Sequence, residues 1–145
     1  MNILIRSTLS KRGPSAARIR ADLQALLRAE GLHAAEVSVL LVGDRAMRTL
    51  NRRYRGKDRT TDVLSFPMRE GRFSRMCREL LGDIVICGPA AGRQARSAGV
   101  TLREETGRLL VHGLLHLLGY DHERGGREAR RMEEREKRLQ EALER

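Results

Sequence analysis

The stretch that decides the fold runs from Leu109 to His122 and reads LLVHGLLHLLGYDH. Its leucines and its valine fall on all sides of a helix with about 3.6 residues per turn, and a helix that is apolar all round is a buried one. Gly119 ends this helix, because glycine adopts the left-handed conformation of a helix C-terminus with little strain. We therefore expect a central, buried helix around which the rest of the chain packs.

Three of the four histidines of the chain lie in this stretch, at positions 112, 116 and 122. Helical spacing puts His112 and His116 on one face, and a reversal after Gly119 brings His122 toward the same point. Three neutral imidazoles that leave a fourth position open are typical of a catalytic zinc ion, since structural zinc sites are closed by four protein ligands. The spacing predicts a hydrolase with one zinc ion per chain, although such a ligand set also suits nickel, copper or iron.

The same histidine and glycine spacing occurs in the metzincin proteases, whose motif is H-E-x-x-H-x-x-G-x-x-H. Gly113 stands here where those enzymes carry the glutamate that acts as general base, so the sequence disfavours peptide hydrolysis by that mechanism. We expect Gly113 instead to keep the helix open beside the metal, with room for a bulky substrate. The fourth histidine, His33, follows Gly31 and is interpreted as an ordinary surface residue.

Outside the central helix, the pattern alternates short β-rich runs with helical segments. Strands are expected at 2–6, 36–43, 62–66 and 81–87, and further helices after Gly13-Pro14, over 45–53, from Gly88-Pro89 to about 97, and over 126–144. Pro14 is expected in the first turn of its helix, and Asp44 is expected to cap the helix over 45–53. Thr101 and Glu104 form a capping box for the central helix. This order predicts one α+β or α/β layered domain with about four strands.

The charge of the chain points to an anionic partner. The 145 residues carry a net charge of +10, and nearly all of the cations are arginines, whose planar fork suits phosphate. Nucleic acid is favoured over a membrane surface, because no cationic amphipathic segment has an aromatic face. An arginine-rich coding composition explains the same excess, so charge alone does not decide the function. The two cysteines, the lack of an apolar run long enough for a membrane span and the short apolar start favour the cytoplasm.

Four segments together resemble the YbeY family of bacterial endoribonucleases and ribosomal RNA maturation factors. They are HGLLHLLGYDH at 112–122, NRRYRGK at 51–57, TTDVLSFP at 60–67 and LGDIVIC at 81–87. Their order and spacing cover nearly the whole chain. One departure is Thr60, since the family pattern usually has proline before Thr-Asp.

This resemblance implies a single metal-dependent endoribonuclease domain over 1–145, with an α+β fold and a mostly parallel or mixed sheet packed with helices. It implies zinc on His112, His116 and His122, with Arg55 matching a functionally important arginine of the family. It also implies cleavage of single-stranded RNA in 3′-end maturation of 16S ribosomal RNA and in ribosome quality control. Ribosomal RNA, the small ribosomal subunit and its assembly proteins are then the expected partners.

The expected chemistry assigns catalytic roles to Arg55 and His116. Arg55 would stabilise charge on the phosphoryl oxygens, while water or a ribose 2′-hydroxyl attacks phosphorus. Asp121 is interpreted as a carboxylate that orients a histidine ligand, and Asp62 and Asp83 receive no catalytic role. Two alternatives stay open: a zinc metalloprotease-like hydrolase, and a non-catalytic ribosome assembly factor whose metal serves stability. The oligomeric state is not readable from the sequence.

Overall fold

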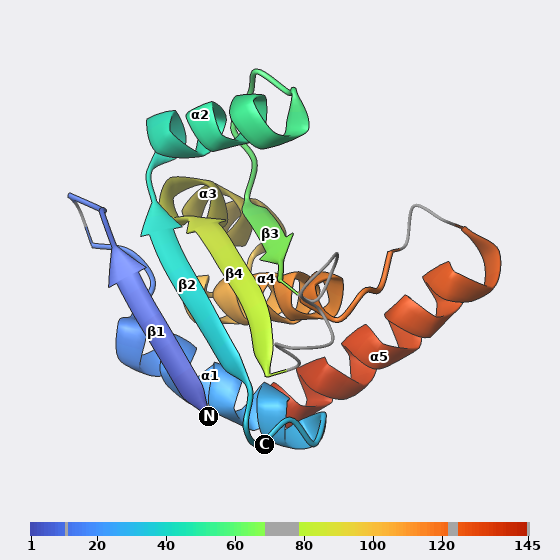
Figure 1. Cartoon of the computed structure of the whole chain (residues 1–145). Coiled ribbons are helices and arrows are strands. Elements are labelled where there is room, and N and C mark those ends of the chain that lie inside the picture. The colour runs from blue at the N-terminus through green and yellow to red at the C-terminus, as the bar shows by residue number, and fades with distance from the viewer. Residues whose placement is uncertain (11, 69–78, 122–124, 145) are drawn as a thin grey trace.

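The computed structural model describes residues 1–10, 12–68, 79–121 and 125–144 (Figure 1). Within these ranges the chain forms one α+β domain of five helices and four strands. In chain order they are β1 (Asn2–Ser7), α1 (Ala16–Ala29), β2 (Glu36–Val42), α2 (Asp44–Arg55), β3 (Val63–Pro67), β4 (Leu80–Cys87), α3 (Gly88–Ala98), α4 (Leu102–Leu117) and α5 (Gly126–Glu144).

The four strands form one mixed sheet in the order β1-β2-β4-β3. Strands β1, β2 and β4 run parallel, and β3 pairs antiparallel along β4, with Ser65 opposite Ile84. The expected fold class and mixed sheet are therefore confirmed. Figure 1 shows α1, α3 and α4 behind the sheet, whereas α2 lies across the end at which β2 and β4 finish.

Helix α4 is the buried centre that the sequence predicts. Leu109, Leu110 and Leu114 are completely buried in the main core, together with strand residues such as Ile84. The expected capping box is present, with the Thr101 hydroxyl accepting from the Glu104 backbone N–H. Gly119 has a φ of 94° just after the helix end, as expected for a glycine that stops a helix. None of the described helices is long and apolar enough to cross a membrane.

Two helix starts differ from the sequence prediction. Pro14 lies outside α1, which is capped by the Ser15 hydroxyl on the Arg18 N–H. Asp44 does not cap α2; it is the first helical residue, and its carboxylate binds both terminal nitrogens of Arg93 at 3.0 and 2.8 Å. An arginine fork on a neighbouring helix thus takes up the oxygens that a cap would have used.

The end of α2 also lies further along the chain than position 53. The helix continues to Arg55 and ends at Gly56, which has a φ of 69°. Because Gly56 takes the left-handed conformation without strain, the helix ends there and the following residues turn back toward β3. Arg55 is therefore held by a helix instead of a loose turn.

Candidate active-site cleft

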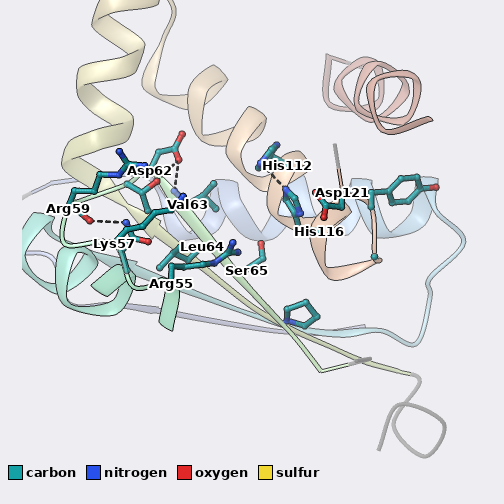
Figure 2. A pocket seen from close by; sticks show the side chains of 15 residues that line it. Arg55, Lys57, Arg59, Asp62, Val63, Leu64, Ser65, His112, His116 and Asp121 are labelled. Atoms are coloured by element: carbon teal, nitrogen blue, oxygen red, sulfur yellow. Dashed lines mark hydrogen bonds between the residues drawn. The ribbon is translucent and has the colours of Figure 1, made fainter. Parts of the chain in front are cut away.

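A cleft of about 380 Å³ opens between α4 and the segment that joins α2 to β3 (Figure 2). Its walls include Arg55, Lys57, Arg59, Asp62, Ser65, His112, His116, Tyr120 and Asp121. Two segments about 50 residues apart in the sequence thus face the same space. Of the predicted site residues, Arg55, His112, His116 and Asp121 come together here, whereas His122 lies outside the described residues.

His112 and His116 meet at one point on the α4 wall. Their Nε2 atoms are 3.1 Å apart and their ring centroids 4.6 Å apart. Two nitrogen ligands of one tetrahedral zinc ion, each about 2.05 Å from the metal, lie about 3.3 Å from each other. The pair therefore fits a zinc ion that would take both rings as ligands. Within the described ranges no group of three His, Cys, Asp or Glu residues is placed to hold a metal ion, so a third ligand at His122 stays a prediction.

A carboxylate lies behind the first of these histidines. Glu136 of α5 places Oε1 3.5 Å from the Nδ1 atom of His112. Such a carboxylate orients the ring and favours the tautomer with its proton on Nδ1, which leaves Nε2 a lone pair for a metal. The sequence analysis missed Glu136 within the charged segment 126–144. Its position between Met132 and Leu139, which are both buried, was the signal that it faces α4.

Gly113 does not line the cleft, so the expectation that it opens the helix to a bulky substrate is wrong. A Cβ atom at this position would lie 2.9 Å from Cγ2 of Ile84, because α4 packs directly on β4 here. The Gly113 carbonyl also accepts a hydrogen bond of 3.1 Å from the Ser65 hydroxyl. Glycine is thus required by the approach of α4 to the sheet. The same contact excludes the protease glutamate at this position.

The opposite wall is basic. Arg55 ends α2, and Lys57 and Arg59 follow in the turn, which is held by a hydrogen bond of 2.9 Å from Asn51 Nδ2 to the Arg59 carbonyl. None of the ion pairs formed within the described part of the chain involves these three cations. Figure 2 shows Arg55 on the same cleft as Ser65 and His116. This wall therefore offers positive charge to an anion that lies against the histidines.

Asp62 is fixed at the end of the cleft by contacts on two sides. Its Oδ1 accepts from the Val63 backbone N–H at 2.8 Å, and its Oδ2 lies 3.6 Å from Arg108 of α4. Arg108 also binds Glu105 at 2.7 Å, and this hydrogen bond raises the pKa of the guanidinium above its usual value. Asp83, by contrast, lies outside this cleft and accepts a hydrogen bond from the Ser38 hydroxyl of β2. Asp62 thus ties β3 to α4, as a structural carboxylate at a strand end does.

Comparisons with known proteins agree with this fold. A family model described as Endoribonuclease YbeY matches residues 8–144. A protein of that name from Anaeromyxobacter sp. (strain Fw109-5) is 54% identical over 129 residues, which make up 88% of this chain and 65% of the relative. Another from Aquifex aeolicus (strain VF5) is 48% identical over 128 residues, or 88% of this chain and 83% of the relative. The solution structure of a Thermotoga maritima protein matches with a TM-score of 0.68 and 29% identity, over 97% of this chain and 88% of that one.

Proposed function

The chain belongs to the YbeY endoribonuclease family, and on that premise we propose that it is a zinc-dependent endoribonuclease that cleaves single-stranded RNA. The observation that carries the proposal is the cleft itself. One wall holds two imidazole nitrogens 3.1 Å apart, and the other holds three cations that form no ion pair within the described ranges. A scissile phosphate between these walls would meet a metal site on one side and guanidinium groups on the other.

His112, His116 and His122 would hold the zinc ion. When bound, zinc supplies a Lewis acid that polarises a phosphoryl oxygen and lowers the pKa of coordinated water to about 7. The two described histidines fit this role through their converging Nε2 atoms. Glu136 would keep His112 in the required orientation from the side away from the cleft.

The basic wall would bind the RNA backbone and stabilise the charge that develops on it. Arg55 would donate paired hydrogen bonds to the non-bridging phosphoryl oxygens, an interaction that strengthens as negative charge accumulates. Lys57 would bind a neighbouring phosphate through its compact positive charge, and Arg59 would bind another through its planar guanidinium group. None of these contacts reads a base, so the cleft residues predict weak sequence preference.

Family membership supports a proposal for the wider biological role. We propose that the enzyme acts in the cytoplasm on the 3′ end of 16S ribosomal RNA and in ribosome quality control, beside the small ribosomal subunit and its assembly proteins. The main alternative function is that of a non-catalytic assembly factor, which would use the same basic wall and bind zinc for stability. The metalloprotease alternative is disfavoured, because Ile84 occupies the space that a side chain at position 113 would need.

Cleavage of RNA separates these functions. Labelled single-stranded and duplex RNA are incubated with the purified protein, with a metal-stripped sample and with His116→Ala, and the fold of each sample is checked by circular dichroism. We expect cleavage of the single strand by the zinc-loaded protein only. A folded protein that holds one zinc ion per chain and leaves RNA intact would support the assembly factor instead.

A further inference from the structure

The positive charge of the protein is concentrated beside the cleft. The 16 residues from Asp44 to Arg59 contain seven arginine and lysine residues but only two aspartates, which accounts for half of the net charge of +10. Helix α5 has six basic and six acidic residues over 19 positions and is therefore neutral. An arginine-rich coding composition would raise the number of arginines in both helices, and it does not explain why α2 lacks the balancing carboxylates that α5 carries.

Four arginines of α2 form a continuous row. Arg45, Arg48, Arg52 and Arg55 are spaced by three, four and three residues, which puts them on one side of the helix, and all four are exposed. Met47, which is completely buried, faces the protein from the other side. We call the four residues the arginine stripe. It extends for about 15 Å at 1.5 Å per residue, and it ends at Arg55 in the cleft.

Among the described residues, one carboxylate partly neutralises the stripe. Asp58 accepts two hydrogen bonds from Arg48, at 2.9 and 3.2 Å, and lies 3.8 Å from Arg52. Arg45 takes part in none of the ion pairs within the described ranges. Exposed pairs of this kind contribute little and are readily exchanged for a phosphate. The stripe thus presents several unbalanced guanidinium groups in line with the cleft.

We propose that the arginine stripe is a second RNA-binding surface, which holds the phosphates of the strand that flanks the scissile bond. This inference rests on the proposed function, and it identifies the surface that would hold the RNA substrate outside the cleft. The occupant is single-stranded RNA because the stripe is continuous with Arg55, so that one backbone can contact both surfaces. The contacts are to phosphates, and they favour longer substrates irrespective of sequence.

The test is equilibrium binding of the Arg45→Gln/Arg52→Gln double variant, which leaves every cleft residue in place. Fluorescence anisotropy is measured with single-stranded RNA of roughly 20 nucleotides and of about four nucleotides, at several salt concentrations. Each phosphate contact adds about 0.7 to the slope of log K against log salt for single strands, so losing two contacts should reduce that slope by about 1.4. We expect binding of the long RNA to weaken on the order of tenfold, and binding of the short RNA to stay unchanged.

The matched control is Arg28→Gln/Arg96→Gln, which removes the same charge from exposed positions of α1 and α3. An equal loss in this control, an equal loss on the short RNA or an unchanged salt slope would overturn the proposal. So would a double variant that keeps its RNA binding and loses binding to phosphatidylserine vesicles. Because binding is measured without cleavage, a wild-type protein that binds long RNA but does not cleave it would count against the proposed function alone.

Discussion

Helices α2 and α5 are both densely charged and both contact or supply residues of the cleft, yet they act on it in opposite ways. The seven cations at α2 and its following turn outnumber two aspartates, and Arg55 faces the cleft directly. The charges of α5 balance each other, and Glu136 contacts His112 from behind. Basic side chains that outnumber the neighbouring carboxylates are available to bind an anionic ligand. Where the two kinds of charge are equal in number, they can pair with each other or orient residues of the protein. For these two helices, the difference between basic and acidic residues therefore says more about their role than the total number of charged residues does.

The largest effect is expected from removing the side chain with which α2 reaches the cleft. Arg55→Ala should lower kcat for RNA cleavage by about 100- to 1,000-fold, as expected when a preorganised donor to a developing charge is lost. Arg53→Ala is the control, because Arg53 is an exposed arginine of the same helix that does not line the cleft. Steady-state cleavage of one single-stranded RNA compares the two. Similar losses in both variants would show that α2 acts only through its overall charge.

The corresponding change in α5 is Glu136→Gln, which keeps the size of the side chain and removes its charge. We expect zinc affinity to fall by about 10- to 100-fold, because the carboxylate no longer orients His112. Competition with a chromophoric chelator measures the affinity independently of cleavage. Glu133→Gln removes the same charge from an exposed position of the helix and should leave zinc affinity unchanged. If Glu136→Gln bound zinc as tightly as wild type, Glu136 would not orient His112 for the metal, and α5 would contribute only to the packing of the core.

A third change tests how α4, which forms one wall of the cleft, packs on β4. Gly113→Ala would push a methyl group against Ile84, and we expect it to destabilise the fold by about 1–3 kcal/mol. Urea unfolding monitored by circular dichroism gives the free energy of unfolding. Ile84→Val removes the Cδ1 atom that lies 3.3 Å from the new methyl position and keeps the closer Cγ2 atom, so it should cost less stability in the Gly113→Ala background than in wild type. An equal cost in both backgrounds would mean that the added methyl group does not press on Ile84.

The smallest effect concerns how α2 is anchored to α3. Hydrogen bonds from Arg93 hold the pKa of Asp44 below its usual value of about 3.8. A lowered carboxylate pKa in the folded state stabilises the protein above about pH 4, and the contribution is lost as pH falls through the folded pKa. Because both side chains are about half exposed, we expect less than about 1 kcal/mol. Stability between pH 7 and pH 2 should fall less steeply in Asp44→Asn than in wild type, and parallel curves would contradict this assignment.

The parts of the fold that depend on near neighbours in the sequence could be predicted. The buried helix through Leu109 and Leu114 follows from its own periodicity, and the capping box at Thr101 needs only Glu104. The meeting of His112 and His116 likewise follows from a spacing of four residues. These features could be predicted because the residues that cause them lie within one or two helical turns of each other.

Features that depend on a distant partner could not be predicted from one sequence. Asp44 looks like a helix cap until Arg93, 49 residues away, takes its oxygens. Gly113 looks like an opening toward the substrate until Ile84 is seen against it. Glu136 contacts a histidine 24 residues earlier in the chain, and only the buried neighbours on its helix face hinted at this. The third metal ligand, His122, remains a prediction from the motif.

The contact between Gly113 and Ile84 also constrains the evolutionary history open to this chain. A glutamate at position 113 is the substitution that would complete a peptidase motif, but it collides with β4 as long as Ile84 is present. A smaller residue at position 84, arising first, would leave a void in the core and lower stability. Each substitution alone is expected to lower stability, so a change from this motif to its protease counterpart would need both substitutions together.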